Sequence, residues 1–288
     1  MFWLMLTAHA FAADCPADLT GDDMVDTIDM SLLLADWGGS GDADLNESGR
    51  VDGADLSILL AVWGACPAEE FACGDLLVDD RDGNAYTTKL YGATCWMTEN
   101  LDHGLRIDGD TPGGLATDDG IVLKFCFDDD PDACVNNGAL YSWSEATAFE
   151  GSSNTVPSNL QGACPDGWHL PSDAEYQVLE GHLGMNEEDV QAMESWRGAP
   201  LGTQMKAGGS TGFEGLLVGW RDAVDGTYKN QNFYGGFWSA TAVATVKTGS
   251  AEAINRGLLA PYQTVGRFAY DLRAGLAIRC VGNILEDD

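Results

Sequence analysis

The chain has 288 residues, of which 46 are acidic and 14 are basic, and its formal net charge is −32. A negative charge of this size disfavours binding to nucleic acid and to anionic membranes. Because 45% of the residues are hydrophobic and nine are tryptophan, the composition predicts a folded protein and not an acidic disordered coil.

The first twelve residues are apolar and end in the small-residue pattern Ala10-Phe-Ala12. This is typical of the apolar segment and cleavage site of a secretory signal, although the usual basic start is absent. We expect residues 1–12 to be a signal-peptide remnant; the alternative is a buried N-terminal helix. No other stretch is long enough to span a membrane. The sequence thus predicts a secreted protein, extracellular or attached to a cell surface.

Two twelve-residue segments, 18–29 and 44–55, repeat the same pattern 26 positions apart. Each places oxygen-bearing side chains at positions 1, 3, 5, 9 and 12. This is the spacing with which one short loop surrounds a calcium ion, a hard cation that takes six to eight oxygen ligands. The repeat therefore predicts two calcium loops.

A helix is expected after each loop. Apolar residues follow with the i, i+3, i+4, i+7 spacing of one helix face, and Gly38 and Gly64 stand where each helix would end at a left-handed cap. The two apolar sets are Met30, Leu33, Leu34 and Trp37, and Leu56, Leu59, Leu60 and Trp63. A solvated, disordered acidic tail, the alternative for these charges, would not carry two such faces.

No helix is expected before either loop, because Cys15-Pro16 and the glycine-rich run 38–42 precede them. A duplicated loop–helix unit without entering helices resembles the type I dockerin, a small all-α calcium module that binds a cohesin receptor. The resemblance covers about residues 15–66, within an expected module at 13–66, and implies two Ca²⁺ ions. It also implies a cohesin-like protein or a cell-surface component as partner, with a docking surface near Thr27, Ile28, Gly53 and Ala54.

The resemblance also implies the calcium ligands. The first ion would be held by Asp18, Thr20, Asp22, the Met24 carbonyl, Asp26 (directly or through water) and Asp29; the second by Asp44, Asn46, Ser48, the Arg50 carbonyl, Asp52 and Asp55. Two departures stand out. Asp23 occupies position 6, where a sharp turn favours glycine, and the neutral Ser48 occupies position 5.

A short linker, 67–72, is expected before a second domain at 73–283, which an acidic tail, 284–288, follows. Asp82-Gly83 predicts a hairpin, and the capping box Ser172 to Glu175 predicts a helix through about Leu183. A second helix is expected from about Leu140 to Phe149. The later half reads as short strands between glycine-rich turns.

Six sequence blocks in order resemble the Fibrobacter major paralogous domain, abbreviated FISUMP. They are the hairpin block ending at Tyr86, Cys95-Trp-Met-Thr-Glu-Asn-Leu101, Gly138-Ala-Leu-Tyr-Ser-Trp143, Cys164-Pro-Asp-Gly-Trp-His-Leu-Pro171 with Glu175, Phe237-Trp-Ser-Ala-Thr241 and Arg279-Cys-Val281. The resemblance implies a C-type-lectin-like fold with two or more helices and an antiparallel sheet. The expected fold class is therefore α+β, with an all-α calcium module in front.

Eight cysteines fit an exported protein with paired thiols. The two resemblances suggest the pairs Cys15–Cys66 around the dockerin-like module and Cys164–Cys280 as the long disulfide of lectin-like domains. Cys73–Cys95 and Cys126–Cys134 would then remain. This pairing is one of 105 arithmetical possibilities. A zinc site is disfavoured, because the chain has no C-x-x-C pair.

Three functions stay open. The first is a non-catalytic attachment protein, whose calcium module docks to a partner and whose larger domain binds a glycan or a surface. The second is a hydrolase or accessory protein of polysaccharide degradation, but no pair of catalytic carboxylates can be chosen from the sequence. The third is a structural spacer. Lectin-like domains that bind sugar through calcium usually have a Glu-Pro-Asn or Gln-Pro-Asp triplet, and this sequence has neither. Exposed aromatic residues are therefore the ligand-binding candidates, above all Tyr228, Phe233 and Tyr234.

Overall fold

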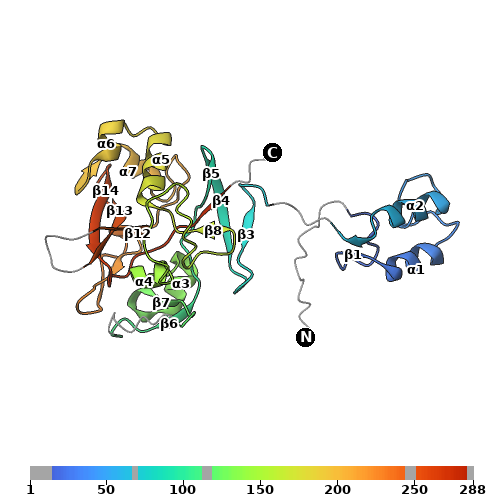
Figure 1. Ribbon diagram of the computed structural model, residues 1–288, viewed down its shortest axis with the longest axis horizontal. Helices are drawn as coiled ribbons and strands as arrows, with labels where there is room; N and C mark the ends of the chain where they lie inside the picture. Colours follow the sequence, from blue (N-terminus) through green and yellow to red (C-terminus); the bar gives the residue numbers. More distant parts are fainter. Residues whose placement is uncertain (1–14, 67–70, 112–118, 244–250, 284–288) are drawn as a thin grey trace. The chain divides into compact units, whose positions relative to one another are not determined.

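The computed structural model describes residues 15–66, 71–111, 119–243 and 251–283. The chain divides into two compact units, Met1–Phe71 (unit 1) and Ala72–Asp288 (unit 2), and each is described by itself (Figure 1). The expected signal-peptide remnant, residues 67–70 of the expected linker and the expected acidic tail lie outside the described residues.

Unit 1 contains two helices of equal length and a two-stranded antiparallel sheet. Each helix begins at an aspartate N-cap that forms a capping box with the aspartate three residues later: Asp26 with Asp29, and Asp52 with Asp55. Such a box satisfies N–H groups that have no partner within the helix. The elements are β1 (Met24–Val25), α1 (Thr27–Ala35), α2 (Gly53–Ala61) and β2 (Gly64–Ala65).

The two repeats of unit 1 pair with each other reciprocally. Val25 in the first loop pairs with Gly64, which follows the second helix. Val51 in the second loop accepts a hydrogen bond from Gly38 N–H and donates one to the Gly39 carbonyl, after the first helix. The small core has the same symmetry, because its buried residues come in pairs 26 positions apart: Ala17 and Ala43, Val25 and Val51, Leu33 and Leu59.

Unit 2 is built from several sheets. The five-stranded sheet has the order β3-β4-β5-β15-β8, the four-stranded sheet has the order β12-β13-β14-β9, and two further pairs are β6-β7, which is parallel, and β10-β11. The strands are β3 (Leu76–Val78), β4 (Ala85–Tyr91), β5 (Thr94–Met97), β6 (Leu105–Ile107), β7 (Leu123–Phe125), β8 (Trp168–His169), β9 (Ser195–Arg197), β10 (Trp220–Arg221), β11 (Tyr228–Lys229), β12 (Tyr234–Val243), β13 (Glu252–Leu259), β14 (Val265–Asp271) and β15 (Val281–Asn283).

The helices of unit 2 are short. The longest is α5, and it begins at the expected capping box of Ser172 and Glu175 and packs against β12 and α6. The second expected helix is reduced to the four residues of α4. The helices are η1 (Phe127–Asp129), α3 (Pro131–Asn137), α4 (Trp143–Ala146), α5 (Asp173–His182), α6 (Glu187–Gln191) and α7 (Leu201–Met205).

The expected fold class is wrong. The structure is mostly β and 21% helical, with several sheets, one of them curled into a half-barrel; it has no clear all-α module and is only loosely compatible with the α+β class. Unit 1 is not all-α, because Val25 and Val51, at position 8 of the two loops, each pair with the backbone that follows the helix of the other repeat. In unit 2 the later half of the chain was expected to form short strands, but β12, β13 and β14 are long strands.

Four disulfides stabilise the two units. Cys15–Cys66 closes unit 1, and Cys73–Cys95, Cys126–Cys134 and Cys164–Cys280 lie in unit 2. The pairs suggested by the two resemblances are the pairs that the structure contains. Cys164–Cys280 fixes the chain just before β8 to the chain just before β15, which are neighbouring strands of the five-stranded sheet.

Candidate functional sites

The two expected calcium loops follow the same backbone path. Positions 4 and 6 have positive φ in both loops: Gly21 at 73° and Asp23 at 63°, and Glu47 at 53° and Gly49 at 88°. Glycine adopts this left-handed region without steric cost, and other residues do so rarely. Each loop thus has one glycine and one acidic residue at its two left-handed positions, in opposite order. The left-handed conformation at position 4 was not predicted from the sequence.

The position-1 aspartates hold these loops in shape. The carboxylate of Asp18 accepts N–H groups from Gly21 at 2.7 Å and Asp23 at 2.8 Å. Asp44 accepts those of Ser48 at 2.9 Å and Gly49 at 2.6 Å. Burial raises the pKa of Asp18, but these backbone hydrogen bonds outweigh it and leave the pKa below its ordinary value. The carboxylate is therefore ionised at neutral pH.

The position-12 aspartates, Asp29 and Asp55, are fully buried. Each binds the N–H of its helix N-cap residue at 2.8 Å with one oxygen. The other oxygen binds the N–H of the position-3 residue at 3.1 Å. One carboxylate thus joins the start of the loop to the start of the helix.

Some of the expected ligand oxygens converge. The Thr20 hydroxyl lies 3.1 Å from an oxygen of Asp18 and 3.1 Å from an oxygen of Asp29. The Ser48 hydroxyl lies 3.4 Å from an oxygen of Asp44 and 3.2 Å from the Arg50 carbonyl. Positions 1, 3 and 12 therefore meet in the first loop, and positions 1, 5 and 7 meet in the second.

Other expected ligands have protein partners. The side chains of Asp22 and Asn46 accept the N–H of Met24 and Ser48, and Asp26 and Asp52 cap the helices. Among the described residues, the loops do not bring three carboxylates within 4.8 Å of one another. The donor set is nonetheless all oxygen, which fits a hard divalent cation.

The expected docking surface lies at the first turns of α1 and α2, where Thr27, Ile28, Gly53 and Ala54 are all exposed. Ile28 is 54% exposed. The C-terminal halves of the two apolar repeats are also exposed at the surface: Leu34 49%, Trp37 48%, Leu60 52% and Trp63 45%. Only Leu33 and Leu59 of the two expected faces are fully buried, so the symmetric unit presents a symmetric set of apolar side chains.

The three aromatic candidates of unit 2 do not form an exposed patch. The Tyr228 hydroxyl donates to Asp129 at 2.6 Å, and its ring packs against Phe127 with centroids 5.3 Å apart. Tyr234 is half-buried and lies 3.3 Å from an Asn255 oxygen. Phe233 alone of the three is exposed, at 47%.

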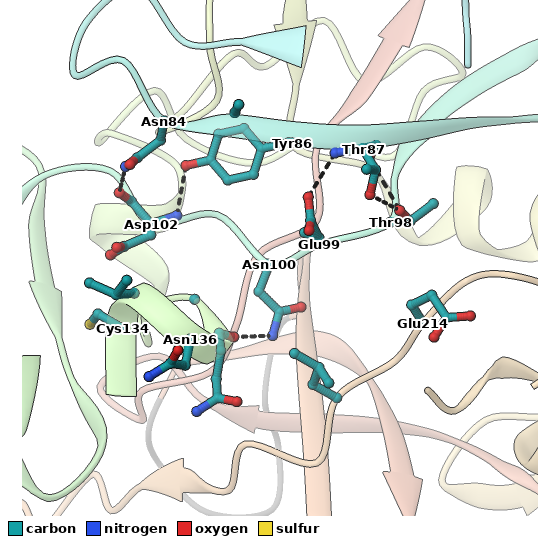
Figure 2. Close-up of a pocket in the computed structure, with 15 residues that line it drawn as sticks. Asn84, Tyr86, Thr87, Thr98, Glu99, Asn100, Asp102, Cys134, Asn136 and Glu214 are labelled. Atoms are coloured by element: carbon teal, nitrogen blue, oxygen red, sulfur yellow. Dashed lines mark hydrogen bonds between the residues drawn. The ribbon is translucent and has the colours of Figure 1, made fainter. Parts of the chain in front are cut away.

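Unit 2 contains a polar cavity of about 370 Å³ that sequence reasoning missed. It lies between β4, the end of β5, the C-terminal end of α3 and the segment around Glu214. Figure 2 shows the side chains of Glu99, Asn100, Asn136 and Glu214 around it. These residues are up to 115 positions apart in the sequence, so no local pattern could have grouped them.

A buried arginine fixes two walls of this cavity. Arg279 is fully buried and donates to the Asn100 side chain at 2.7 Å, the Phe213 carbonyl at 2.5 Å and the Glu214 carbonyl at 2.7 Å. The Asn100 amide in turn donates to the Asn137 carbonyl at 2.9 Å. Burial lowers the pKa of Arg279 to about 10, so the guanidinium stays charged at neutral pH.

A known protein family matches most of unit 2. Residues 90–282 match the Fibrobacter succinogenes major domain (Fib_succ_major), which is well over half of the chain. The chain belongs to this family. The FISUMP resemblance is thereby confirmed for the larger part of unit 2. No curated protein and no solved structure matches the chain.

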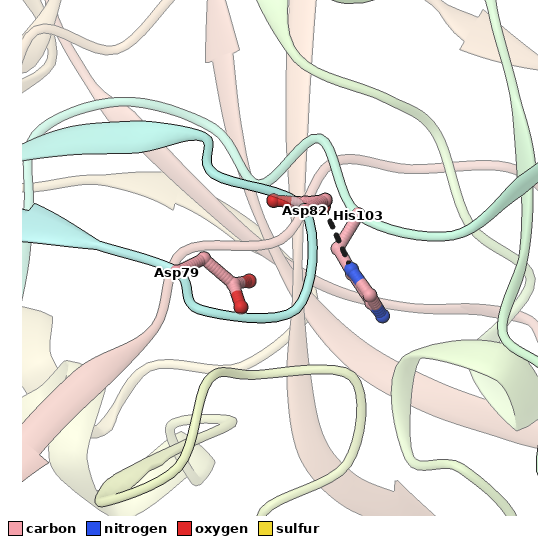
Figure 3. Close-up of side chains that lie close together, drawn as sticks. All are labelled: Asp79, Asp82 and His103. Carbon is pink, nitrogen blue, oxygen red and sulfur yellow. Dashed lines mark hydrogen bonds and ion pairs between the residues drawn. The ribbon is translucent and has the colours of Figure 1, made fainter. Parts of the chain in front are cut away.

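Unit 2 also contains a group of three potential metal ligands, two of which precede the matched part of the Fibrobacter succinogenes major domain. Asp79, Asp82 and His103 have potential ligand atoms within 4.8 Å of one another, at the turn of the expected β3–β4 hairpin. His103 Nδ1 lies 2.8 Å from an oxygen of Asp82, and a dashed line marks this contact in Figure 3. Asp79, however, is fully engaged with Arg81, whose Nε and Nη2 lie 2.8 and 2.7 Å from its two oxygens.

The Asp79 carboxylate is therefore already neutralised by the chain. Burial raises its pKa, but the hydrogen bonds and charge of Arg81 outweigh burial and hold the pKa below its ordinary value. A metal ion at this carboxylate would lie beside a guanidinium. The arrangement fits a structural role: Arg81 also donates to the Ala163 carbonyl and so connects the hairpin turn to the rest of the domain.

In the part of the chain that the structure describes, no helix is both long enough and apolar enough to cross a membrane. The four disulfides fit an oxidising compartment, and they are compatible with an extracellular protein.

Proposed function

We propose that the protein is a secreted attachment protein in which unit 1 is a dockerin-like module that binds two Ca²⁺ ions and a protein partner, while unit 2 binds an extracellular ligand. The observation that carries the proposal is the identity of the two loops. Both have the same left-handed positions, the same position-1 carboxylate bonded to the turn, and the same buried position-12 carboxylate.

Calcium would bind at the converging oxygens of Asp18, Thr20 and Asp29 in the first loop and of Asp44, Ser48 and Arg50 in the second. The ion would supply positive charge where the described part of unit 1 has a single basic residue, Arg50. Repulsion among the many acidic residues of the unit is not balanced by this single basic residue, so folding of the unit should be coupled to the metal.

The partner-binding surface of unit 1 would be the start of α1 and α2. The exposed residues Thr27, Ile28, Gly53 and Ala54 occupy equivalent places in the two repeats. A receptor of the cohesin type would therefore meet the same backbone positions in either repeat but different side chains, because Gly53 and Ala54 stand where the first repeat has Thr27 and Ile28. Calcium would act on docking indirectly, because each surface lies on the first turn of a helix that a loop carboxylate caps.

The first test is hydrogen exchange of the full chain with calcium and with a chelator. The amides of Val51 and Cys66 report on unit 1, since their hydrogen bonds join the two repeats. We expect chelation to remove their protection and to leave β13 unchanged. Unchanged protection at Val51 and Cys66 would contradict the proposal.

The matched variants are Asp18→Ala with Asp44→Ala, compared with Asp42→Ala, an exposed acid outside the expected ligand positions. The double variant should lose the calcium-dependent protection and any binding to a cohesin-type receptor. Asp42→Ala should retain both. A double variant that still docks in a calcium-dependent manner would refute metal-gated attachment.

A further inference from the structure

We propose that the polar cavity of unit 2 binds a neutral, hydroxyl-rich sugar unit. This inference deepens the ligand-binding role proposed for unit 2, and it concerns a site separate from the calcium loops. With a volume of about 370 Å³, the cavity falls within the usual range for small-ligand sites, roughly 300–1,000 Å³.

The lining of the cavity is rich in hydrogen-bonding groups. It combines carboxylates, side-chain amides and hydroxyls, and among the described residues that line it none is basic. The polar side chains are Asn84, Tyr86, Thr87, Thr98, Glu99, Asn100, Asp102, Asn136, Asn137 and Glu214. An anionic ligand is disfavoured, because it would meet the carboxylates of Glu99 and Glu214 and no basic side chain of the lining.

Two carboxylates each have an oxygen without a hydrogen-bond partner among the described residues. Glu99 Oε2 accepts the Thr87 N–H at 2.7 Å, and Glu214 Oε2 accepts the Gly208 N–H at 2.7 Å. Each carboxylate thus uses one oxygen to hold its position and keeps the other for a ligand. The hydroxyls of a sugar are donors that such oxygens accept. Asp102, the third acid, lies 2.5 Å from Lys124, so its charge is already balanced.

The cavity is held open by contacts that do not depend on a ligand. Arg279 binds both Asn100 and the Glu214 carbonyl, and Asn100 binds the end of α3 through the Asn137 carbonyl. One buried guanidinium therefore fixes two walls directly, and Asn100 links the end of α3 to them. Pre-formed polar sites lose little entropy when a ligand binds. The backbone of Glu214 is left-handed, with a φ of 52°, a conformation in which glycine would be less strained.

A metal ion is a weaker candidate for this cavity. Within the described residues, the one group of three metal-ligating side chains within 4.8 Å is Asp79, Asp82 and His103. Glu99 and Glu214 are therefore not gathered with a third ligand around a common point.

The test uses the full chain with calcium present. Cellotriose, xylotriose and mannotriose are titrated against the ¹⁵N-labelled protein by NMR, with trigalacturonic acid as the anionic comparison. We expect at least one neutral trisaccharide to shift the amides of Thr87, Glu99, Asn136 and Glu214, and trigalacturonic acid to bind at least tenfold more weakly. Equal or tighter binding of the acidic sugar would overturn the proposal.

The variants Glu99→Gln and Glu214→Gln keep the size of each side chain and should weaken sugar binding at least tenfold with an unchanged Tm. Glu188→Gln, on the exposed face of α6, is the matched control and should bind as the original chain does. Absence of binding by all three neutral sugars, or shifts centred on Phe233 instead of the cavity, would overturn the inference.

The two proposals fail separately. A sugar titration that fails while Val51 and Cys66 remain protected in calcium counts only against the cavity. Protection that survives chelation while a neutral sugar still binds at Glu99 and Glu214 counts only against the calcium module.

Discussion

The two units stabilise their acidic residues differently. In unit 1 the buried Asp29 and Asp55 bind backbone N–H groups, and the one basic side chain, Arg50, is exposed. In unit 2 the buried Asp173 and Glu180 bind arginines: Arg256 lies 2.6 Å from Asp173 and 2.7 Å from Glu180. On our proposal, calcium supplies in unit 1 the positive charge that the chain itself supplies in unit 2.

The largest effect is expected from removing the shared arginine of unit 2. Arg256→Met leaves Asp173 and Glu180 with fewer charged partners in a fully buried site. Breaking a buried ion pair in this way costs roughly 3–5 kcal/mol. The free energy of unfolding of unit 2, measured in urea by exchange of the β13 amides, should fall by about that amount, with unit 1 unaffected.

The control is Arg273→Met, because Arg273 pairs with Asp271 at the surface and its side chain is 52% exposed. Exposed pairs contribute about 1 kcal/mol or less. A loss as large as that of Arg256→Met would show that burial does not set the difference between these pairs.

Acid titration should separate the units by their dependence on calcium. Burial raises the pKa of Asp173, but Arg256 and Arg267 outweigh it, so the folded-state pKa lies below the ordinary 3.8. The stabilisation is present above about pH 3.8 and is lost as pH falls through the folded-state pKa. Asp173→Asn should lower the Tm of unit 2 at pH 7 and flatten its fall below pH 4.

Calcium concentration provides the second axis of this experiment. On our proposal, protons compete with calcium for the carboxylates of unit 1, so the acid unfolding of unit 1 should move to lower pH as calcium rises. The acid unfolding of unit 2 should not move. A common shift of both units with calcium would remove the contrast between them.

The sequence predicted features that depend on neighbouring residues. The repeated loops, the capping box of Ser172 and Glu175 and the hairpin at Asp82-Gly83 are all present. The left-handed conformation of Asp23 was also foreseen from its position in the loop. Each of these follows from the chemistry of a few adjacent positions.

Features set by distant residues were missed. Val25 pairs with Gly64, 39 positions later, and this pairing makes the all-α expectation wrong. Arg279 meets Asn100 across 179 positions to build the cavity wall. Neither contact has a periodic signal in the sequence, because each depends on how distant segments of the chain come together.

The smallest effect tests the symmetry of the two loops. Left-handed backbone costs a non-glycine residue roughly 1–2 kcal/mol, and glycine returns part of this through greater freedom of the unfolded chain. Asp23→Gly and Glu47→Gly should therefore each stabilise calcium-loaded unit 1 by about 0.5–1 kcal/mol. Glu47→Gly should gain more, because aspartate tolerates this region better than glutamate.

The mirror variants Gly21→Ala and Gly49→Ala should destabilise the same unit by about 1 kcal/mol, although neither added Cβ would meet another atom within 4 Å. All four effects can be measured as changes in the exchange free energy of the Val51 and Cys66 amides. If Asp23→Gly lowered the stability of calcium-loaded unit 1, the aspartate at position 6 would contribute more through its charge or hydrogen bonding than its backbone costs, and the two loops would differ in how they hold the metal.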